Sequence, residues 1–118
     1  MKKVLLIDDD DSYRRVLEYN LETEGYEVLT ASSGEDGLAA FHEQNPDLII
    51  TDMKMNGMSG LELLEAVKKV RADTRVIVIT ACGTADTAAA VMMHGACDCL
   101  IKPFKRDILN QAVRKAFT

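Results

Sequence analysis

The stretch LIITDMKMNGMSG, residues 48–60, decides the fold class of this chain. Its first four residues are apolar or β-branched, which is typical of a strand covered on both faces. Asp52 follows that strand and begins a segment with two glycines and several polar turn formers. That composition predicts a loop over residues 52–60. The sheet that contains this strand is therefore expected to carry helices on both of its faces.

Apolar runs alternate with helical patterns along the rest of the chain. Further strands are predicted at residues 3–7, 26–30, 75–80 and 97–101. A helix is predicted after each strand, because apolar residues recur there at helical spacing. The second helix is also predicted by a capping box formed by Ser33 and Asp36. The apolar positions of the helices are Tyr13, Val16, Leu17 and Leu21; Leu38 and Phe41; Leu63, Leu64 and Val67; the alanine-rich residues 84–94; and Ile108, Leu109, Ala112, Val113 and Ala116.

Five strands that alternate with five helices predict an α/β fold with a parallel sheet. Right-handed crossovers restrict the topology to a doubly wound sheet. We expect a flavodoxin-like (βα)5 three-layer sandwich with the strand order 2-1-3-4-5. A length of 118 residues suits one domain, residues 1–118. In this order a ligand crevice lies at the carboxyl ends of strands 1 and 3, where the strand order reverses.

Composition narrows the classes of function. The formal net charge is −5, so the domain has no electrostatic reason to bind nucleic acid or an anionic membrane by itself. No apolar run approaches the roughly 20 residues that a membrane span needs. The chain has three cysteines, an odd number. The apolar run near its start, residues 4–7, is too short for a signal peptide. We therefore expect a cytoplasmic protein with reduced thiols.

Every strand near the expected crevice ends in a polar or charged residue. Asp8 and Asp9 follow the first strand, and Asp52 follows the third. Thr80 ends the fourth strand, and Lys102 follows the fifth. Because the carboxyl ends of parallel strands meet at one edge of a sheet, these five side chains are expected to lie together. Their joint occurrence carries more weight than any one of them.

The three carboxylates predict a metal site. Two unit charges about 4 Å apart repel by roughly 4 kcal/mol at an effective dielectric constant near 20, so either one carboxylate takes a proton or a metal ion is present. Oxygen ligands of this kind suit Mg²⁺. A carboxylate beside Mg²⁺ can act as the nucleophile in phosphoryl transfer, with Lys102 and Thr80 as partners of the phosphoryl oxygens. The neighbouring Asp10 and Asp11 are instead interpreted as the N-cap and first-turn acids of a helix.

Four segments carry a resemblance to a known family. LLIDDDDS at residues 5–12, IITDMKMNGMSGLELL at 49–64, VIVITACG at 76–83 and GACDCLIKPF at 95–104 resemble the motifs of two-component response-regulator receiver domains, which are CheY-like. The resemblance covers essentially the whole chain. The GMSGLELL segment and the alanine-rich helix look most like receivers of the nitrogen-regulator class, which control transcription.

The resemblance implies a role for each matching residue in the metal site. Asp52 matches the phosphoacceptor of the family. Asp9 matches the direct metal ligand, and Asp8 matches its acidic partner, which acts through water. The backbone carbonyl of Lys54 matches a further ligand. The ion implied is Mg²⁺, with Mn²⁺ as an alternative.

The resemblance also implies partners and an output. Thr80 matches the switch hydroxyl and Lys102 the phosphoryl-binding lysine, whose bond to Pro103 is cis in the family. The phosphoryl donor would be a sensor histidine kinase, and the chain would catalyse only its own phosphorylation and dephosphorylation. The face formed by the helix at residues 84–94, the strand at 97–101 and the last helix would control an output domain or a downstream protein. A homodimer through that face is a further candidate.

Several positions depart from the family pattern. Cys99 stands where an aromatic switch residue is usual, and Asn56 stands where proline is commonest, which is expected to loosen the loop after Asp52. An alternative function is therefore a phosphorylation-independent interaction module. Cys82 and Cys99 are interpreted as reduced thiols, with an oxidised pair as the competing hypothesis. A flavin carrier is disfavoured by the four aspartates at residues 8–11, and a dehalogenase-like phosphohydrolase would need aspartate where Lys54 stands.

Overall fold

One five-stranded parallel sheet of order β2-β1-β3-β4-β5 forms the centre of the computed structural model, which describes residues 1–81 and 84–118. This order confirms the expected flavodoxin-like topology. The strands are β1 (Lys3–Ile7), β2 (Glu27–Ala31), β3 (Leu48–Asp52), β4 (Arg75–Thr80) and β5 (Asp98–Ile101). The helices are α1 (Asp11–Thr23), α2 (Gly34–Gln44), α3 (Gly60–Val70), α4 (Ala85–Met93) and α5 (Arg106–Ala116).

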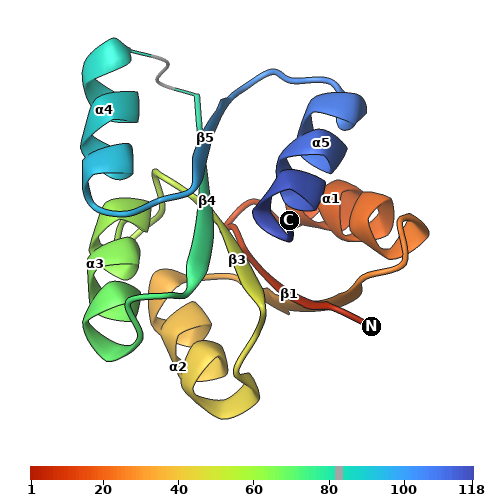
Figure 1. The fold of residues 1–118 in the computed structure, drawn as a ribbon, viewed down its shortest axis with the longest axis horizontal. Coiled ribbons are helices and arrows are strands. Elements are labelled where there is room, and N and C mark those ends of the chain that lie inside the picture. The colour runs from red at the N-terminus through yellow and green to blue at the C-terminus, as the bar shows by residue number, and fades with distance from the viewer. Residues whose placement is uncertain (82–83) are drawn as a thin grey trace.

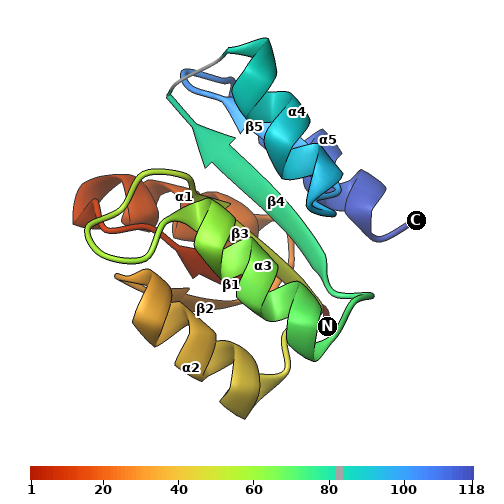
Figure 2. The same ribbon diagram turned by 90° about the vertical axis from the view of Figure 1, so that its left-hand side faces the viewer.

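The helices cover both faces of the sheet, as the apolar strands predict. Figure 1 shows α1 and α5 on one face and α2, α3 and α4 on the other, and Figure 2 shows α3 in front of the sheet between α2 and α4. Alternate strand residues supply the two cores. Leu6 and Ile50 belong to the core beneath α1 and α5, whereas Leu5 and Ile49 belong to the core beneath α2, α3 and α4.

The bounds of β1 and β4 match the predicted ones, whereas those of β2, β3 and β5 differ by one residue. β2 begins at Glu27, and β5 begins at Asp98. Asp52 is the last residue of β3 and not the first residue of the loop, because the ladder with β4 still pairs Asp52 with Ile79. The nucleophile expected from the sequence is therefore held by the sheet itself.

Side-chain caps begin α1, α2, α3 and α4, whereas α5 begins without one. Asp10 is the N-cap of α1 and Asp11 lies in its first turn, as expected. The Ser33 hydroxyl accepts the amide of Asp36 at the start of α2. The complete reciprocal capping box is found at the start of α3, between Ser59 and Glu62, where the sequence pattern had not predicted one.

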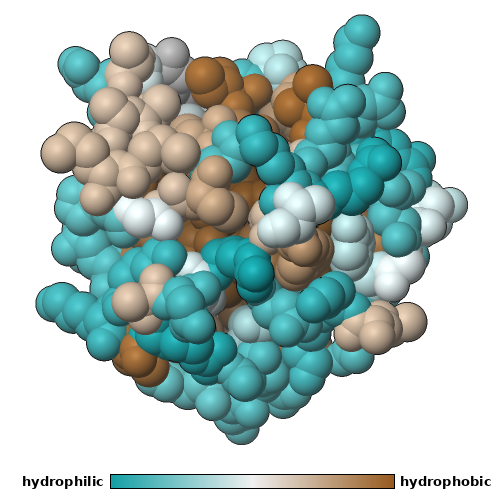
Figure 3. All heavy atoms as spheres, in the orientation of Figure 1, coloured by the Kyte–Doolittle hydropathy of each residue, from teal (hydrophilic) through white to brown (hydrophobic). Residues whose placement is uncertain are grey.

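Apolar side chains gather on the surface over α4 and toward β5. Figure 3 shows these groups beside a mostly hydrophilic remainder of the same face. The large exposed apolar residues of this region are Met92, Met93, Ile101 and Ile108, with 47%, 86%, 46% and 45% of their surface accessible. Within residues 1–81 and 84–118, the helices are all too short or too polar to cross a bilayer.

Candidate phosphoacceptor and metal site

Backbone hydrogen bonds continue past the strand ends and place the site residues. The amide of Met53 donates to the carbonyl of Ile79 at 2.7 Å, which fixes the chain directly after Asp52. The amide of Lys102 donates to the carbonyl of Thr80 at 2.8 Å, which fixes the chain directly after β5. Because main-chain atoms set these positions, the side chains start from a rigid edge.

Asp8, Asp9 and Asp52 form the acidic cluster that the sequence predicts. One carboxylate oxygen from each lies within 4.8 Å of the other two. Asp8 and Asp52 are buried, whereas Asp9 is exposed. The Oδ1 atom of Asp8 accepts the amide of Asp10 at 2.9 Å, and the Oδ2 atom of Asp9 accepts the amide of Asn56 at 3.0 Å. Backbone donors therefore orient two of the three carboxylates.

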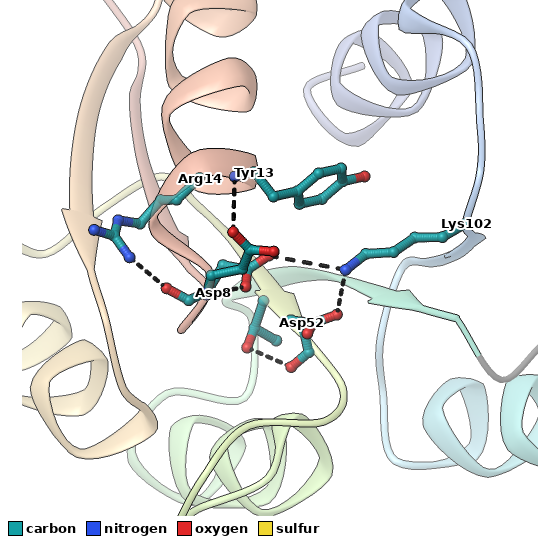
Figure 4. A network of polar contacts seen from close by, with 7 residues as sticks. Asp8, Tyr13, Arg14, Asp52 and Lys102 are labelled. Carbon is teal, nitrogen blue, oxygen red and sulfur yellow. Dashed lines mark hydrogen bonds and ion pairs between the residues drawn. The ribbon is translucent and has the colours of Figure 1, made fainter.

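Lys102 reaches across the cluster from β5. Its Nζ atom lies 3.3 Å from Oδ1 of Asp52 and 4.0 Å from Oδ2 of Asp8. The same atom lies 4.3 Å from the ring centroid of Tyr13, on α1. Figure 4 shows the extended lysine side chain pointing at the two acids, with the tyrosine ring beside it. The lysine cation therefore faces the two buried acids of the cluster.

A hollow of about 330 Å³ opens over Asp52 and is lined by Asp52, Lys54, Ala81 and Lys102. The methyl side chain of Ala81 leaves the entrance wide. Thr80 is 1% exposed and is the last residue of β4, directly before Ala81. The structure therefore brings all the predicted residues to one end of the sheet, with a space above the expected nucleophile.

Burial shapes the ionisation of the two buried acids. It raises the pKa of Asp52 above its usual value, and the charge of Lys102 opposes that rise. Burial also raises the pKa of Asp8, with a hydrogen bond from Asp10 opposing and the charge of Asp52 adding to the rise. Burial penalises the ionised carboxylates, and a divalent cation bound by their oxygens would offset that penalty. The donor set therefore fits Mg²⁺.

The raised pKa of Asp52 predicts how stability depends on pH without metal. The folded chain holds this proton more tightly than the unfolded chain. The contribution of Asp52 to the free energy of unfolding therefore falls as pH rises from about 4 through the folded pKa. Asp52→Asn does not titrate, so its advantage in Tm over the parent should grow between about pH 4 and pH 7. Thermal unfolding in EDTA tests this, with exposed Asp73→Asn as control; an advantage that shrinks with pH would contradict it.

The loop after Asp52 is tied to the acidic cluster by a backbone hydrogen bond. Asn56 was expected to loosen this loop because it replaces proline. Its backbone N–H instead donates to Asp9, a bond that proline cannot make. The loop closes where the amide of Gly60 donates to the carbonyl of Met53 at 2.8 Å. A Cβ atom on Gly60 would collide with the carbonyl oxygen of Asp52, so any other residue here would require the backbone to shift.

Two residues of this site were not identified from the sequence. Tyr13 was assigned to the apolar stripe of the first helix, and its ring does contact that core. It also lies against Lys102. Arg14 donates from a guanidinium nitrogen to the backbone carbonyl of Asp8 at 2.7 Å. Tyr13 and Arg14 lie in the first turn of a helix that directly follows the acids, and this position could have indicated that they are near the site.

The thiol of Cys99 lies half-buried beside the core under α2, α3 and α4, and this burial raises its pKa. Cys82 lies outside the described residues. The structure therefore does not test the hypothesis that Cys82 and Cys99 form an oxidised pair. The peptide bond between Lys102 and Pro103 is cis, as the resemblance implied.

The sequence of this chain is similar to those of known proteins. The profile described as the response regulator receiver domain matches residues 4–114. The transcriptional regulatory protein GlrR of Escherichia coli is 38% identical over 113 residues, which are 96% of this chain and 26% of GlrR. AfsQ1 of Streptomyces coelicolor is 37% identical over 115 residues, which are 97% of this chain and 50% of AfsQ1. The chain thus spans about a quarter to a half of these relatives.

Solved structures agree with the sequence relatives. A response regulator receiver domain protein from Clostridium thermocellum matches with a TM-score of 0.94 and 39% identity, over 98% of this chain and 94% of that one. The response regulator TrrA from Thermotoga maritima, solved in complex with Mg²⁺ and BeF, matches with a TM-score of 0.90 and 35% identity, over 98% and 99% of the two chains. With its acids, threonine and lysine at one sheet edge, the chain belongs to the response regulator receiver domain family of two-component systems.

Proposed function

We propose that Asp52 accepts a phosphoryl group from the phosphohistidine of a sensor histidine kinase. The observation that carries this proposal is the Lys102 Nζ atom, 3.3 Å from Oδ1 of a buried Asp52 beneath an open hollow. A carboxylate oxygen of Asp52 attacks phosphorus while the bond from phosphorus to the histidine nitrogen breaks. The Lys102 ammonium and the Thr80 hydroxyl then meet the phosphoryl oxygens.

Asp8, Asp9, Asp52 and the backbone carbonyl of Lys54 would hold Mg²⁺, with Mn²⁺ as an alternative ion. The ion would supply positive charge beside the transferring group. The proximity of the three carboxylates within 4.8 Å supports this assignment. The complex of TrrA with Mg²⁺ and BeF supports it by analogy at 35% identity.

Phosphorylation would be read out through α4, β5 and α5. A phosphoryl group adds roughly −1.5 to −2 charge units at neutral pH, so Lys102 and Thr80 gain a new partner. The resulting population shift would alter the face that bears exposed Met92, Ile101 and Ile108. An output domain or a downstream protein would bind there, and a second copy of the chain is a further candidate. The transcriptional regulators among the relatives, which are longer than this chain, support an output in transcription.

The remaining assignments follow from the same site. Residues 1–118 would act as a single receiver in the cytoplasm, without direct binding to nucleic acid or membrane. The chain would act on no substrate other than its own Asp52. The alternative, an interaction module independent of phosphorylation, requires none of Asp9, Asp52, Thr80 and Lys102. The assembly of all four at one edge therefore favours the phosphoacceptor.

Incubation with acetyl phosphate and Mg²⁺, followed by intact mass measurement, tests the proposal. The parent chain should gain one phosphoryl adduct, and Asp52→Asn should gain none because it lacks the nucleophilic carboxylate. The exposed Asp73→Asn variant serves as the matched control and should be modified like the parent. An adduct that persists in Asp52→Asn, or none in the parent, would overturn the proposal.

A further inference from the structure

Lys102 has a third neighbour in addition to the two acids of the proposed mechanism. Its Nζ atom lies 4.3 Å from the ring centroid of Tyr13, within the range of a cation–π interaction. Tyr13 comes from α1, whereas Lys102 follows β5, which is separated from β1 by β3 and β4. Figure 4 shows the Tyr13 ring near the ammonium end of Lys102, on the side away from Asp52.

The ring of Tyr13 is held independently of Lys102. Its backbone amide donates to Oδ1 of Asp10 at 3.1 Å, and the amide of Asp10 donates to Oδ1 of Asp8 at 2.9 Å. The ring also contacts the core that contains Leu17 and Leu109. Asp8 and Tyr13 are thus connected through Asp10, and Lys102 contacts both of them. The ring is therefore a fixed surface on which the flexible lysine side chain rests.

A neutral aromatic partner suits a lysine that must change partners. When Asp52 is modified, the Lys102 ammonium has to exchange a carboxylate oxygen for a phosphoryl oxygen. A third carboxylate beside Lys102 would repel the incoming phosphoryl group, whereas a ring face carries no net charge. Burial and the charges of Asp8 and Asp52 raise the pKa of the Tyr13 hydroxyl, which keeps the residue neutral.

We propose that Tyr13 is a positioning residue that holds the Lys102 ammonium over Asp52 through its ring face. This inference rests on the proposed role of Asp52. Lys102 has a long flexible stem, so loss of the ring should let it leave the hollow for solvent. Ligands that need the lysine should bind more weakly, whereas a metal held by the acids alone should not.

Beryllofluoride, a mimic of a phosphoryl group, is the probe that tests this. In the presence of Mg²⁺, Tyr13→Leu should bind beryllofluoride about fivefold more weakly than the parent. Its affinity for Mg²⁺ alone should not fall, because Lys102 is not a metal ligand and its departure removes a positive charge that lies 3.3 Å from Asp52. Tyr13→Phe keeps the ring face and should restore the affinity for beryllofluoride. Tyr19→Leu, at a 67% exposed tyrosine of the same helix, is the matched control.

Two further measurements separate positioning from a purely structural role. In a Lys102→Met background, Tyr13→Leu should cause no additional loss of beryllofluoride affinity, because the partner of the ring is already absent. By NMR, the ε-methylene protons of Lys102 should be shifted upfield by the ring in the parent and in Tyr13→Phe, and not in Tyr13→Leu. The NMR shift does not depend on phosphorylation.

The outcomes distinguish this inference from the proposed function. Equal beryllofluoride affinity in the parent and Tyr13→Leu would overturn the role of Tyr13 and leave Asp52 as the phosphoacceptor. A full fivefold loss that persists in the Lys102→Met background would also overturn it, because the effect would not pass through the lysine. A parent chain that binds Mg²⁺ but neither beryllofluoride nor a phosphoryl group would overturn both.

Discussion

An Asp8→Asn, Asp9→Asn double variant is expected to bind Mg²⁺ at least about 100-fold more weakly than the parent chain, yet to remain folded. The substitutions replace two of the three carboxylates that lie within 4.8 Å of one another with neutral amides. The asparagine at position 8 can still accept the amide of Asp10. Binding should therefore fall because charge is lost and not because the site is rebuilt.

The same variant should be more stable than the parent when metal is absent. Burial and the charge of Asp52 raise the pKa of Asp8, which means that the ionised cluster costs stability at neutral pH. Removing two charges relieves that cost. In the parent, Mg²⁺ should restore this lost stability, because it binds the folded state only.

Calorimetric titration and thermal unfolding with and without Mg²⁺ check both parts of this prediction. Asp10→Asn is the matched control, because asparagine caps a helix about as well as aspartate and Asp10 is outside the acidic cluster. The control should bind Mg²⁺ like the parent. Parental Mg²⁺ affinity in the double variant would show that the acids are not the metal site. A lower Tm in EDTA would show that the ionised acids do not cost stability.

Gly60→Ala should destabilise the domain by about 3 kcal/mol and lower its Tm by roughly 10 °C. Its added Cβ would collide with the carbonyl oxygen of Asp52 and would lie 2.9 Å from Cα of Met53. Both obstacles are backbone atoms at the end of β3, so relief requires moving the strand that carries the nucleophile. The variant should therefore also be phosphorylated more slowly.

Urea unfolding measures the change, and Gly25→Ala provides a comparison. Gly25 has φ +95°, and a Cβ added there would have no other atom within 4 Å, so alanine carries only a conformational cost of about 1 kcal/mol. Gly60→Ala should be clearly the less stable of the two. Equal stability would mean that the start of α3 can move away from β3 without loss.

The fold was predictable because the period of the apolar residues determines it. The strand at residues 75–80 reads RVIVIT, and no helix with one polar face could contain that run. The edge on which the site lies was predictable for a related reason: parallel strands deliver the residues after Ile7, Thr51 and Ile101 to one side. These are properties of the backbone, which periodicity reports well.

Contacts set by side-chain reach and loop closure were not predictable. The bond from the Asn56 amide to Asp9 joins residues 47 positions apart, and its donor is a backbone atom that any residue except proline supplies. The ring of Tyr13 suits a core position, and nothing in its spacing shows that Lys102 reaches it from another element. Such contacts depend on how far a loop bends, which the pattern of residue types does not encode.

The position of Lys102 also links the edge of the sheet to its centre. β5 is an edge strand beside β4, whereas the acids that Lys102 contacts lie at the carboxyl ends of two strands further in, β1 and β3. Each brief separation of β5 from β4 must therefore pull the lysine away from those acids. Deuterium uptake by the amides of β5 should slow when a group on Asp52 binds the lysine more tightly. Hydrogen exchange at the rim of the sheet would then report the chemical state of its central aspartate.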